Sequence, residues 1–563
     1  MILRLKTKKV KQIPIIMGIQ FPLLRQVNSH YCGFCFVFPI NLLILFTTTK
    51  VFDKISLIIL FGGIFMNYTS TRDNSLCVSS SVAIASGISA DGGLFVPCDI
   101  PHIDAGFTAS LVDMDYIHRA RSVLKLFLTD YSNEEIEKYT EGAYGTGFSS
   151  DAVAPTVPVG DKLNILELWH GPTCAFKDMA LQLLPYLLTG AAKRTAGGKE
   201  IVILVATSGD TGKAALEGFK DVDGTRILVF YPEDGVSPMQ KLQMASQLGK
   251  NVGVCAIYGN FDDAQTGVKK IFTDNAVKEK LAANNMAFSS ANSINWGRLV
   301  PQIVYYFSAY ADMIKLGKIK NGDKINITVP TGNFGNILAA YYAKEMGLPV
   351  NKLICASNAN NVLTEFLETG HYNRNRPFYT TVSPSMDILI SSNLERLLYH
   401  LSGNDSEIVR SLYSCLAKTG EFTVGRDILD KIKELFGAGC CDDTATKETI
   451  SYVFKENNYL CDTHTAVAVN VYLDYLKKTG DNTPNVIAST ASPYKFSKAV
   501  LEAVAGRDAL TDDDFAMVDK LKEITGVSAP VQLKSLKGAE VRFKKTVKKE
   551  DMEAAVYELL NIR

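Results

Sequence analysis

The chain has 563 residues, which predicts two to four domains at about 150 residues per domain. Hydrophobic residues make up 47% and charged residues 21%, as in a globular protein with a sizeable core, and Lys plus Arg equals Asp plus Glu at 59 each. This balance argues against a nucleic-acid-binding protein or one that binds an anionic membrane surface, whereas a small anionic substrate needs only a few local cations.

The 11 cysteines are scattered and odd in number. Only Cys32 and Cys35 have CxxC spacing, and no second pair completes a zinc site. We therefore expect no metal, reduced thiols and an intracellular protein, which we place in the cytoplasm.

Residues 1–65 differ from the rest of the chain. The first 52 contain no Asp or Glu, and a basic cluster opens the sequence. The apolar runs 34–46 and 55–65 are each shorter than the ~18 to 20 residues of a membrane-spanning helix. Three interpretations stay open: translation that begins at Met66, an organelle-targeting segment, or a membrane anchor.

From about residue 160, short apolar strands alternate with helical patterns such as 214–219 and 337–346. This alternation predicts an α/β fold with parallel sheets built from βαβ units. The expected strands are residues 163–168, 201–206, 226–231, 251–258, 324–329, 353–356 and 485–489.

The expected organisation after the extension has three parts. Residues 66–155 form an N-terminal subdomain, and residues 156–540 form the catalytic domain with a helical, polar insertion at about 370–460. Residues 541–563 form a C-terminal helix. Ligands of parallel sheets bind at the carboxyl ends of strands, so the loops after the strands are the candidate site.

The loop from His170 to Asp178 places Lys177 where a helix begins, next to Ala175 and Phe176. The positive end of the helix dipole and the apolar neighbours both favour the neutral form of the lysine amine, which Schiff-base chemistry requires. An isolated lysine at such a position is usually solvated.

Two further loops can bind anions. Residues 207–212 open a helix with small hydroxyl residues, but they lack the spacing of a nucleotide P-loop. Residues 331–336 contain Gly332 and Gly335 in a G-x-x-G pattern, which suits a single phosphate monoester better than a dinucleotide.

Taken together, these loops resemble fold type II pyridoxal 5′-phosphate (PLP) enzymes, and most closely the threonine synthase family of the bacterial and fungal type. The resemblance runs from about Tyr68 to the C-terminus. Its most specific segments are residues 171–178, 206–212, 292–298, 329–336, and Asp462 with residues 464–466. Thr463, where Pro is expected, and Ser492, where His is common, depart from the family pattern.

The resemblance implies the residues of a cofactor site. Lys177 would form the Schiff base, and Thr490 would face the pyridine nitrogen. Asp210 would lie beside the phenolic oxygen, where many relatives have Asn. The cofactor phosphate would be held by Gly332, Asn333, Phe334, Gly335 and Asn336.

The implied reaction converts O-phospho-L-homoserine and water to L-threonine and phosphate. Ser208 and Thr211 are candidates for the substrate carboxylate, and Arg298, with Ser293 and Asn295, for the substrate phosphate. A phospholyase that releases 2-oxobutyrate and a non-catalytic homologue are the alternatives. We expect a monomer or homodimer.

Overall fold

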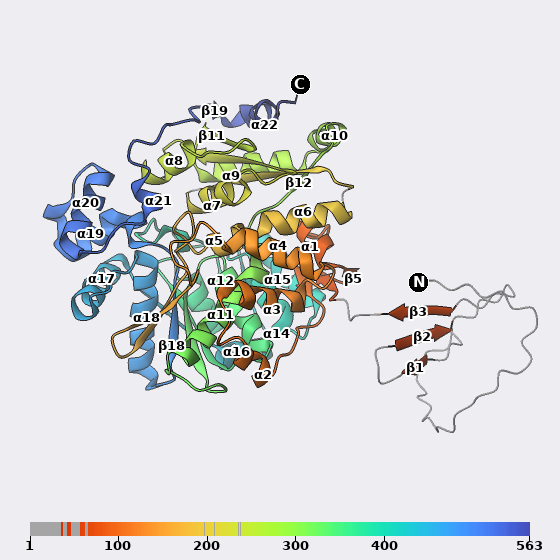
Figure 1. Ribbon diagram of the computed structural model, residues 1–563, viewed down its shortest axis with the longest axis horizontal. Helices are drawn as coiled ribbons and strands as arrows, with labels where there is room; N and C mark the ends of the chain where they lie inside the picture. The colour runs from red at the N-terminus through yellow and green to blue at the C-terminus, as the bar shows by residue number, and fades with distance from the viewer. Residues whose placement is uncertain are drawn as a thin grey trace, which may run out of the picture. The chain divides into compact units, whose positions relative to one another are not determined.

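The computed structural model describes residues 66–562 except 196, 208, 235 and 237, together with the backbone of three strands nearer the N-terminus. The chain divides into two units, residues 1–65 and 66–563 (Figure 1). In the first unit, β1 (Cys35–Val37), β2 (Leu42–Phe46) and β3 (Leu57–Phe61) form an antiparallel sheet. The rest of the predicted targeting or anchor segment, including Cys32 of the Cys32 and Cys35 pair, lies outside the described residues.

The second unit opens with a small antiparallel sheet and four helices. The sheet has the order β5-β4-β6. Ser132 begins α4 with a capping box, in which its hydroxyl and the Glu135 carboxylate each accept a backbone N–H of the other residue. The elements are β4 (Tyr68–Ser70), β5 (Asp73–Val78), α1 (Ser80–Ser86), β6 (Phe95–Pro97), α2 (Ala105–Ser110), α3 (Tyr116–Phe127) and α4 (Asn133–Tyr144).

A five-stranded parallel sheet has the order β12-β9-β10-β11-β19 and lies in the upper part of Figure 1. The strands expected at 201–206, 226–231 and 251–258 are confirmed. The strands are β9 (Glu200–Ala206), β10 (Thr225–Pro232), β11 (Val252–Tyr258), β12 (Met286–Ser289) and β19 (Thr546–Lys548). The associated helices are α6 (Leu184–Thr195), α7 (Asp210–Phe219), α8 (Pro238–Ala245), α9 (Phe261–Thr273), α10 (Asn275–Ala283) and α22 (Met552–Leu560).

The segment expected to be only a C-terminal helix also supplies β19, which closes one edge of this sheet. Three residues are too few to show a strand periodicity, so this strand was not predicted. Residues 541–563 are therefore part of the five-stranded layer.

A six-stranded sheet, with the order β17-β14-β13-β18-β8-β7, carries the remaining predicted strands. All neighbours run parallel except β7 and β8. The strands are β7 (Thr156–Val159), β8 (Leu163–Glu167), β13 (Ile325–Pro330), β14 (Val350–Ser357), β17 (Phe436–Cys440) and β18 (Asn485–Ser489). The main helices of this lobe are α11 (Trp296–Lys315), α12 (Gly335–Glu345) and α18 (Thr463–Thr479).

The predicted insertion at about 370–460 is not a separate lobe. It contributes β17 to the six-stranded sheet and contacts the N-terminal subdomain, where Arg72 donates two hydrogen bonds to Glu395, at 2.9 and 2.8 Å. Its elements are β15 (His371–Asn373), α14 (Leu394–Leu401), α15 (Ser406–Thr419), β16 (Glu421–Thr423), α16 (Arg426–Leu435) and α17 (Asp443–Asn457), after α13 (Val362–Thr369). Helices α19 (Ser497–Ala505), α20 (Asp514–Thr525) and α21 (Val531–Lys534) follow β18.

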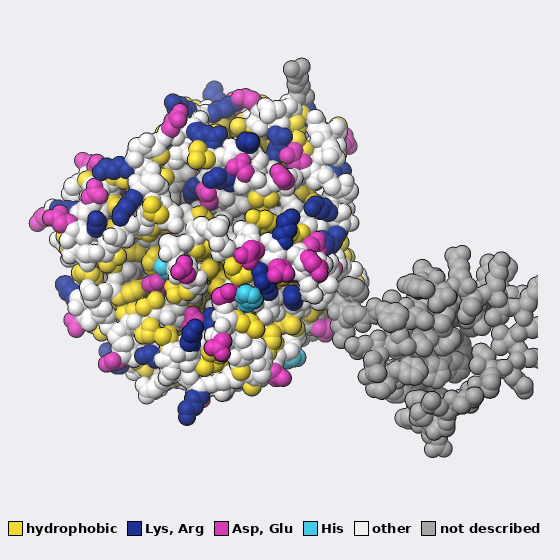
Figure 2. All heavy atoms as spheres, in the orientation of Figure 1, with side chains coloured by type: hydrophobic (Ala, Val, Ile, Leu, Met, Phe, Trp, Pro, Cys, Tyr) yellow, Lys and Arg dark blue, Asp and Glu magenta, His cyan; other side chains and the backbone are white. Residues whose placement is uncertain are grey.

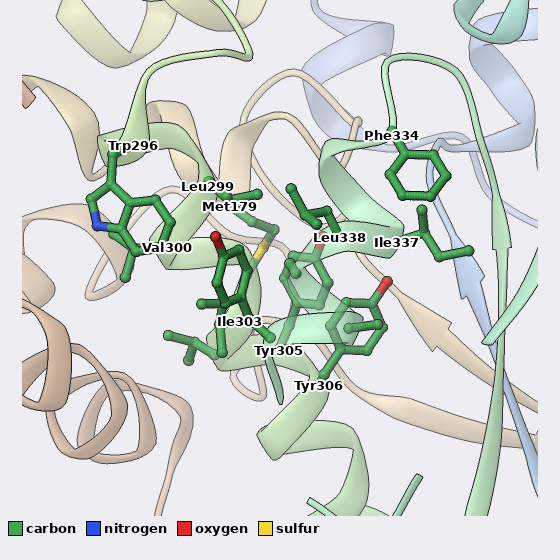
Figure 3. Close-up of a cluster of buried hydrophobic side chains, with 14 of the residues drawn as sticks. Met179, Trp296, Leu299, Val300, Ile303, Tyr305, Tyr306, Phe334, Ile337 and Leu338 are labelled. Carbon is green, nitrogen blue, oxygen red and sulfur yellow. The ribbon is translucent and has the colours of Figure 1, made fainter. Parts of the chain in front are cut away.

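The long helix α11 is the centre of the core. Its side chains Trp296, Leu299, Val300 and Ile303 are fully buried, and Figure 3 shows the apolar side chains of α11 gathered beside Ile337 and Leu338 of α12. Because tight packing fixes the rotation and position of both helices, this cluster positions the polar residues at their N-termini. Those residues include parts of the candidate site.

The distribution of charged side chains on the surface agrees with the equal numbers of basic and acidic residues in the sequence. On the face drawn in Figure 2, Lys and Arg are interspersed with Asp and Glu, with no large field of one sign. Within residues 66–562, no helix has the length and apolar content needed to cross a bilayer.

Candidate active site

Lys177 lies at the start of the short helix α5 (Asp178–Leu181), as its sequence context predicted. The loop before it is held by Asp178, whose carboxylate accepts the Thr173 N–H at 2.8 Å and the Thr173 hydroxyl at 2.7 Å. A Cβ at Gly171 would lie 2.5 Å from the Asp178 Cβ, so this turn requires glycine. The backbone that carries Lys177 is therefore fixed from both sides.

The loop after β18 is tied to this lysine loop. Phe176 N–H donates to the Thr490 carbonyl at 2.8 Å, and Ser492 N–H donates to the Cys174 carbonyl at 3.1 Å. Thr490 is buried, and its hydroxyl has no protein partner among the described residues. Ser492, the departure from the family pattern, uses its hydroxyl to cap the following turn.

The Lys177 amine is enclosed by polar and apolar groups. Its Nζ lies 3.3 Å from Ser385 Oγ, 3.7 Å from Asp210 Oδ2 and 5.0 Å from the centre of the Phe176 ring. Burial lowers the pKa of Lys177 to about 8 against the opposing effect of Asp210, and the positive charge of Arg298 is among the groups that lower it further. The neutral amine, which is the nucleophilic form, is thus accessible near neutral pH.

Asp210 begins helix α7 and accepts hydrogen bonds on Oδ1 from Lys495 at 2.7 Å and Gln240 at 3.0 Å. Burial acts to raise the pKa of this carboxyl, but Lys495 and then Lys177 outweigh burial and hold the pKa far below its usual range. Asp210 is therefore a fixed negative charge beside the Lys177 amine.

The rest of the 207–212 loop is partly occupied by its own hydrogen bonds. The Thr207 hydroxyl accepts the N–H groups of Gly209 and Gly212, each at 3.0 Å. Thr211 is half-buried, and its hydroxyl has no hydrogen-bond partner in the described part of the chain. Ser208, the other candidate for the substrate carboxylate, lies outside the described residues.

The loop between β13 and α12 forms a cup of backbone donors. The N–H groups of Asn333, Phe334, Gly335 and Asn336 have no acceptor among the described residues. Phe334 is left-handed, with φ 64°, and its buried ring lies 5.9 Å from that of Phe436. Consecutive free N–H groups around a left-handed residue at a helix N-terminus are a typical anion site.

Asn336 adds a side-chain donor to this cup. Its Oδ1 accepts the hydroxyls of Tyr305, at 2.6 Å, and Tyr306, and both rings lie close to α12 in Figure 3. These bonds fix the amide, whose buried Nδ2 has no partner in the described residues. A buried donor without a partner is costly, which indicates that a ligand accepts this hydrogen bond.

Arg298 is a buried cation without a carboxylate partner among the described residues. Its Nη1 donates to the Ala291 carbonyl at 2.9 Å, while its buried Nε has no partner. Burial lowers the pKa of the guanidinium to about 10. An uncompensated buried charge of this kind is expected where an anionic ligand binds.

The two residues predicted beside Arg298 differ in their surroundings. Asn295 begins α11 as its cap, and both hydrogens of its amide are used by the carbonyls of Ile84 and Ser290 at 3.0 and 2.7 Å. It has no donor left for a ligand. Ser293 is half-buried, and its hydroxyl has no partner in the described residues.

Three family models match successive parts of the chain. "Threonine synthase N terminus" matches residues 67–144, "Pyridoxal-phosphate dependent enzyme" residues 157–490, and "Threonine synthase, C-terminal" residues 465–554. Threonine synthase of Pseudomonas aeruginosa is 38% identical over 78% of this chain and 91% of its own length. The chain belongs to the threonine synthase family.

Two other relatives place it within that family. The PLP-bound threonine synthase of Brucella melitensis superimposes with a TM-score of 0.79 at 37% identity, over 88% of this chain and all of that one. "Threonine synthase-like 1" of Pongo abelii is 41% identical over 75% of this chain. The chain spans 58% of the length of that relative.

Pyridoxal 5′-phosphate is the cofactor of this threonine synthase family member. The described residues fit it: the free N–H groups at 333–336 and the unpaired Asn336 amide suit its phosphate, and Lys177 has a depressed pKa. In residues 66–562 no cluster of three or more His, Cys, Asp or Glu residues could hold a metal.

Sequence reasoning missed several residues of the site. Ser385 comes from the predicted insertion, and its N–H donates to His464 Nε2 at 3.1 Å. His464 is oriented by Asp462, 2.9 Å from Nδ1, and both belong to a segment on which the family resemblance already rested, although no role was assigned to them. Asn393 donates from its backbone and its amide to the Asn333 carbonyl, at 3.1 and 3.0 Å. The insertion thus closes over the lysine and the phosphate cup.

Proposed function

We propose that this chain is a threonine synthase that converts O-phospho-L-homoserine and water to L-threonine and phosphate. The observation that carries this proposal is a second anion-binding feature, the buried guanidinium of Arg298 on α11, in addition to the free N–H groups of the cup at residues 333–336. The cup accounts for the cofactor phosphate, so the free guanidinium suits a second phosphate, that of the substrate. Membership of the threonine synthase family supports the same reaction.

The cofactor would be held at four points. Lys177 binds it covalently, Gly332 and the four residues that follow it cup its phosphate, Thr490 faces its pyridine nitrogen, and Asp210 lies beside its phenolic oxygen. The free Thr490 hydroxyl and the free N–H groups of the cup support these roles. A hydroxyl cannot hold the pyridine nitrogen protonated as a carboxylate would, and this favours elimination and replacement over transamination.

When bound, the cofactor supplies the electron sink for carbanion chemistry. The Lys177 amine would hold the cofactor and would move protons at Cα and Cβ of the substrate. Ser385 Oγ, 3.3 Å from this amine, orients it. Arg298 would bind the phosphate group that the substrate loses from Cγ, while water would add at Cβ.

The substrate ends would be recognised by different lobes. Thr211, in the first turn of α7, and Ser208, which precedes this helix in the sequence, would bind the carboxylate, and the helix N-terminus favours an anion there. Arg298 and Ser293, at the start of α11, would bind the phosphate. Asn295 is left out of this set because its amide hydrogens are already used.

Product analysis tests the proposal. Purified chain loaded with pyridoxal 5′-phosphate is incubated with O-phospho-L-homoserine, and L-threonine, 2-oxobutyrate and phosphate are measured together. A threonine synthase gives threonine and phosphate in equal amounts. Phosphate with 2-oxobutyrate would identify a phospholyase, and no phosphate release would identify a non-catalytic homologue.

The proposal extends to location and assembly. We place the enzyme in the cytoplasm, as a monomer or homodimer. All nine cysteines of the described residues have free thiols, as in a reducing compartment. Cell fractionation and light scattering test these two points.

A further inference from the structure

A second buried lysine, Lys495, lies against the carboxylate that faces Lys177. It sits on the short 3₁₀ helix η2 (Pro493–Phe496), and its side chain is 1% exposed. Its Nζ contacts Asp210 Oδ1 at 2.7 Å and donates to the Thr173 carbonyl at 2.9 Å. Burying an ammonium is unfavourable unless it is paired, so this lysine is fixed by its two partners.

One carboxylate is thus shared unequally between two lysines. Asp210 Oδ1 faces Lys495 at 2.7 Å, within hydrogen-bond distance. Asp210 Oδ2 faces Lys177 at 3.7 Å, which is too long for a hydrogen bond. Asp210 is therefore an ion-pair partner of Lys495 first and of Lys177 second.

This division decides how firmly Lys177 holds a proton. A buried carboxylate with Lys177 as its sole cationic partner would form a close ion pair and stabilise the charged nitrogen. Lys495 draws the carboxylate toward itself and adds a positive charge near Lys177. Both effects favour the neutral form of the Lys177 nitrogen.

We propose that Lys495 is a positioning residue that sets the protonation of the Lys177 nitrogen by competing with it for Asp210. This inference rests on the proposed attachment of the cofactor at Lys177, and it is independent of which substrate is converted. It also explains how an aspartate is tolerated beside the phenolic oxygen of the cofactor, because Lys495 neutralises its charge.

Other charged groups face Lys177 from neighbouring elements. Arg298 approaches from α11, and Asp178 from α5; burial raises the pKa of Asp178 to about 6 against its bonds to Thr173. Neither contacts Lys495 through a hydrogen bond or an ion pair in the described residues. Variants at 495 and 210 also remove the bond from Lys495 to the Thr173 carbonyl and alter the bond from Gln240 to Asp210, so the single variants are compared with the double variant and with a control lysine.

The test is a pH titration of the visible absorption of the full-length chain loaded with pyridoxal 5′-phosphate, without substrate. The position of the cofactor band reports protonation of the nitrogen that Lys177 contributes. The variants are Lys495→Met, Asp210→Asn and the double variant. Lys213→Met is the matched control, because Lys213 is a buried lysine on the same helix as Asp210, but it pairs with Glu217 at 3.0 Å.

The two single variants should shift the midpoint of this pH titration, which is the pH at which half of the Lys177 nitrogen is protonated, in opposite directions. Lys495→Met leaves Asp210 to Lys177, so the midpoint rises by about one pH unit, a tenfold change in the ratio of protonated to neutral nitrogen at a fixed pH. Asp210→Asn removes the attraction and keeps Lys495, so the midpoint falls. In the double variant Asp210 is absent, so loss of Lys495 should move the midpoint far less than it does in the unaltered chain, and the midpoint should lie close to that of Asp210→Asn.

A purely structural ion pair would lower the melting temperature of each single variant and leave the midpoint unmoved. An unmoved midpoint in Lys495→Met, or a shift of equal size in Lys213→Met, would overturn the proposal. If Lys495→Met does not fold, Asp210→Asn and the double variant still decide: a double-variant midpoint a full pH unit above that of Asp210→Asn would show that Lys495 acts by its own charge and not through Asp210, and would also overturn the proposal. A chain that shows the predicted shifts but forms no threonine would refute the proposed function alone.

Discussion

At the scale of single residues, the site depends on charges that are buried without full compensation. Lys177 has a depressed pKa, and Arg298 has no carboxylate partner in the described residues. Folding around such groups is unfavourable unless ligands restore their partners. The cofactor and an anionic substrate would supply them, so ligand binding should stabilise this chain.

The Lys177 pKa predicts how cofactor attachment depends on pH. The neutral amine attacks the cofactor aldehyde, and a pKa lowered to about 8 means that about a tenth of the amine is neutral at pH 7. As pH rises, the attachment rate of the cofactor-free chain should increase about tenfold per pH unit below about 8 and level off above it. Stopped-flow absorbance measures this rate. A rate that still climbs past pH 10 would show an ordinary lysine.

Arg298→Ala tests the substrate phosphate site. A charge-assisted phosphate contact is worth roughly 1.5 to 3 kcal/mol, so kcat/KM for O-phospho-L-homoserine should fall about tenfold to a hundredfold or more. Cofactor content should stay normal. Arg298→Lys should restore little activity, because an ammonium cannot make a bidentate contact. Unchanged kcat/KM in Arg298→Ala would remove this residue from the substrate site.

At the scale of elements, the loops follow from the sequence better than their partners do. The lysine loop and the cup were predictable because each directly follows a clear apolar strand. The first contains the Lys177-Asp178 pair, and the second contains the G-x-x-G pattern. Ser385 and Lys495 were not predictable, because no local pattern shows that a serine in a polar insertion or a lysine in a short turn reaches the site. Lys495 did carry a signal: it lies five residues after Thr490, in an otherwise buried segment.

Gly335→Val tests the cup at the N-terminus of α12. A Cβ there would already lie 3.4 Å from Asn393 Nδ2, and the larger valine would crowd the free N–H groups. The variant should lose pyridoxal 5′-phosphate on dialysis, whereas Gly425→Val should retain it, because Gly425 begins α16 with nothing within 4 Å of its Cβ. Cofactor is measured by absorbance. Full retention in Gly335→Val would show that the phosphate binds elsewhere.

At the scale of the whole molecule, the catalytic unit is built from distant parts of the sequence. The lysine loop follows β8, the cup follows β13, and Thr490 follows β18, which lies between these two strands in the six-stranded sheet. The alternating pattern predicted parallel β-sheet built from βαβ units, but not its division between two sheets. It could not predict that residues 370–460 return to this site, because those contacts are long-range.

The division of the chain predicts the effect of shortening it. Met66 N–H donates to Thr129 Oγ1 at 2.7 Å, so the catalytic unit is already anchored at this residue. A chain of residues 66–563 should fold, bind pyridoxal 5′-phosphate and match the full-length kcat/KM. Circular dichroism and steady-state kinetics compare the two. An insoluble or inactive short chain beside an active full-length one would show that residues 1–65 contribute to the enzyme.

The assay that tests the central claim most directly follows one reaction to its products. The loaded full-length chain is given O-phospho-L-homoserine, with Lys177→Ala as the blank, because general acid–base catalysis by this amine alone is commonly worth ~10² to 10⁴-fold. The account predicts L-threonine and phosphate in equal amounts from the unaltered chain and neither from the blank. Phosphate accompanied by 2-oxobutyrate, or threonine formed at a near-normal rate by Lys177→Ala, would contradict it.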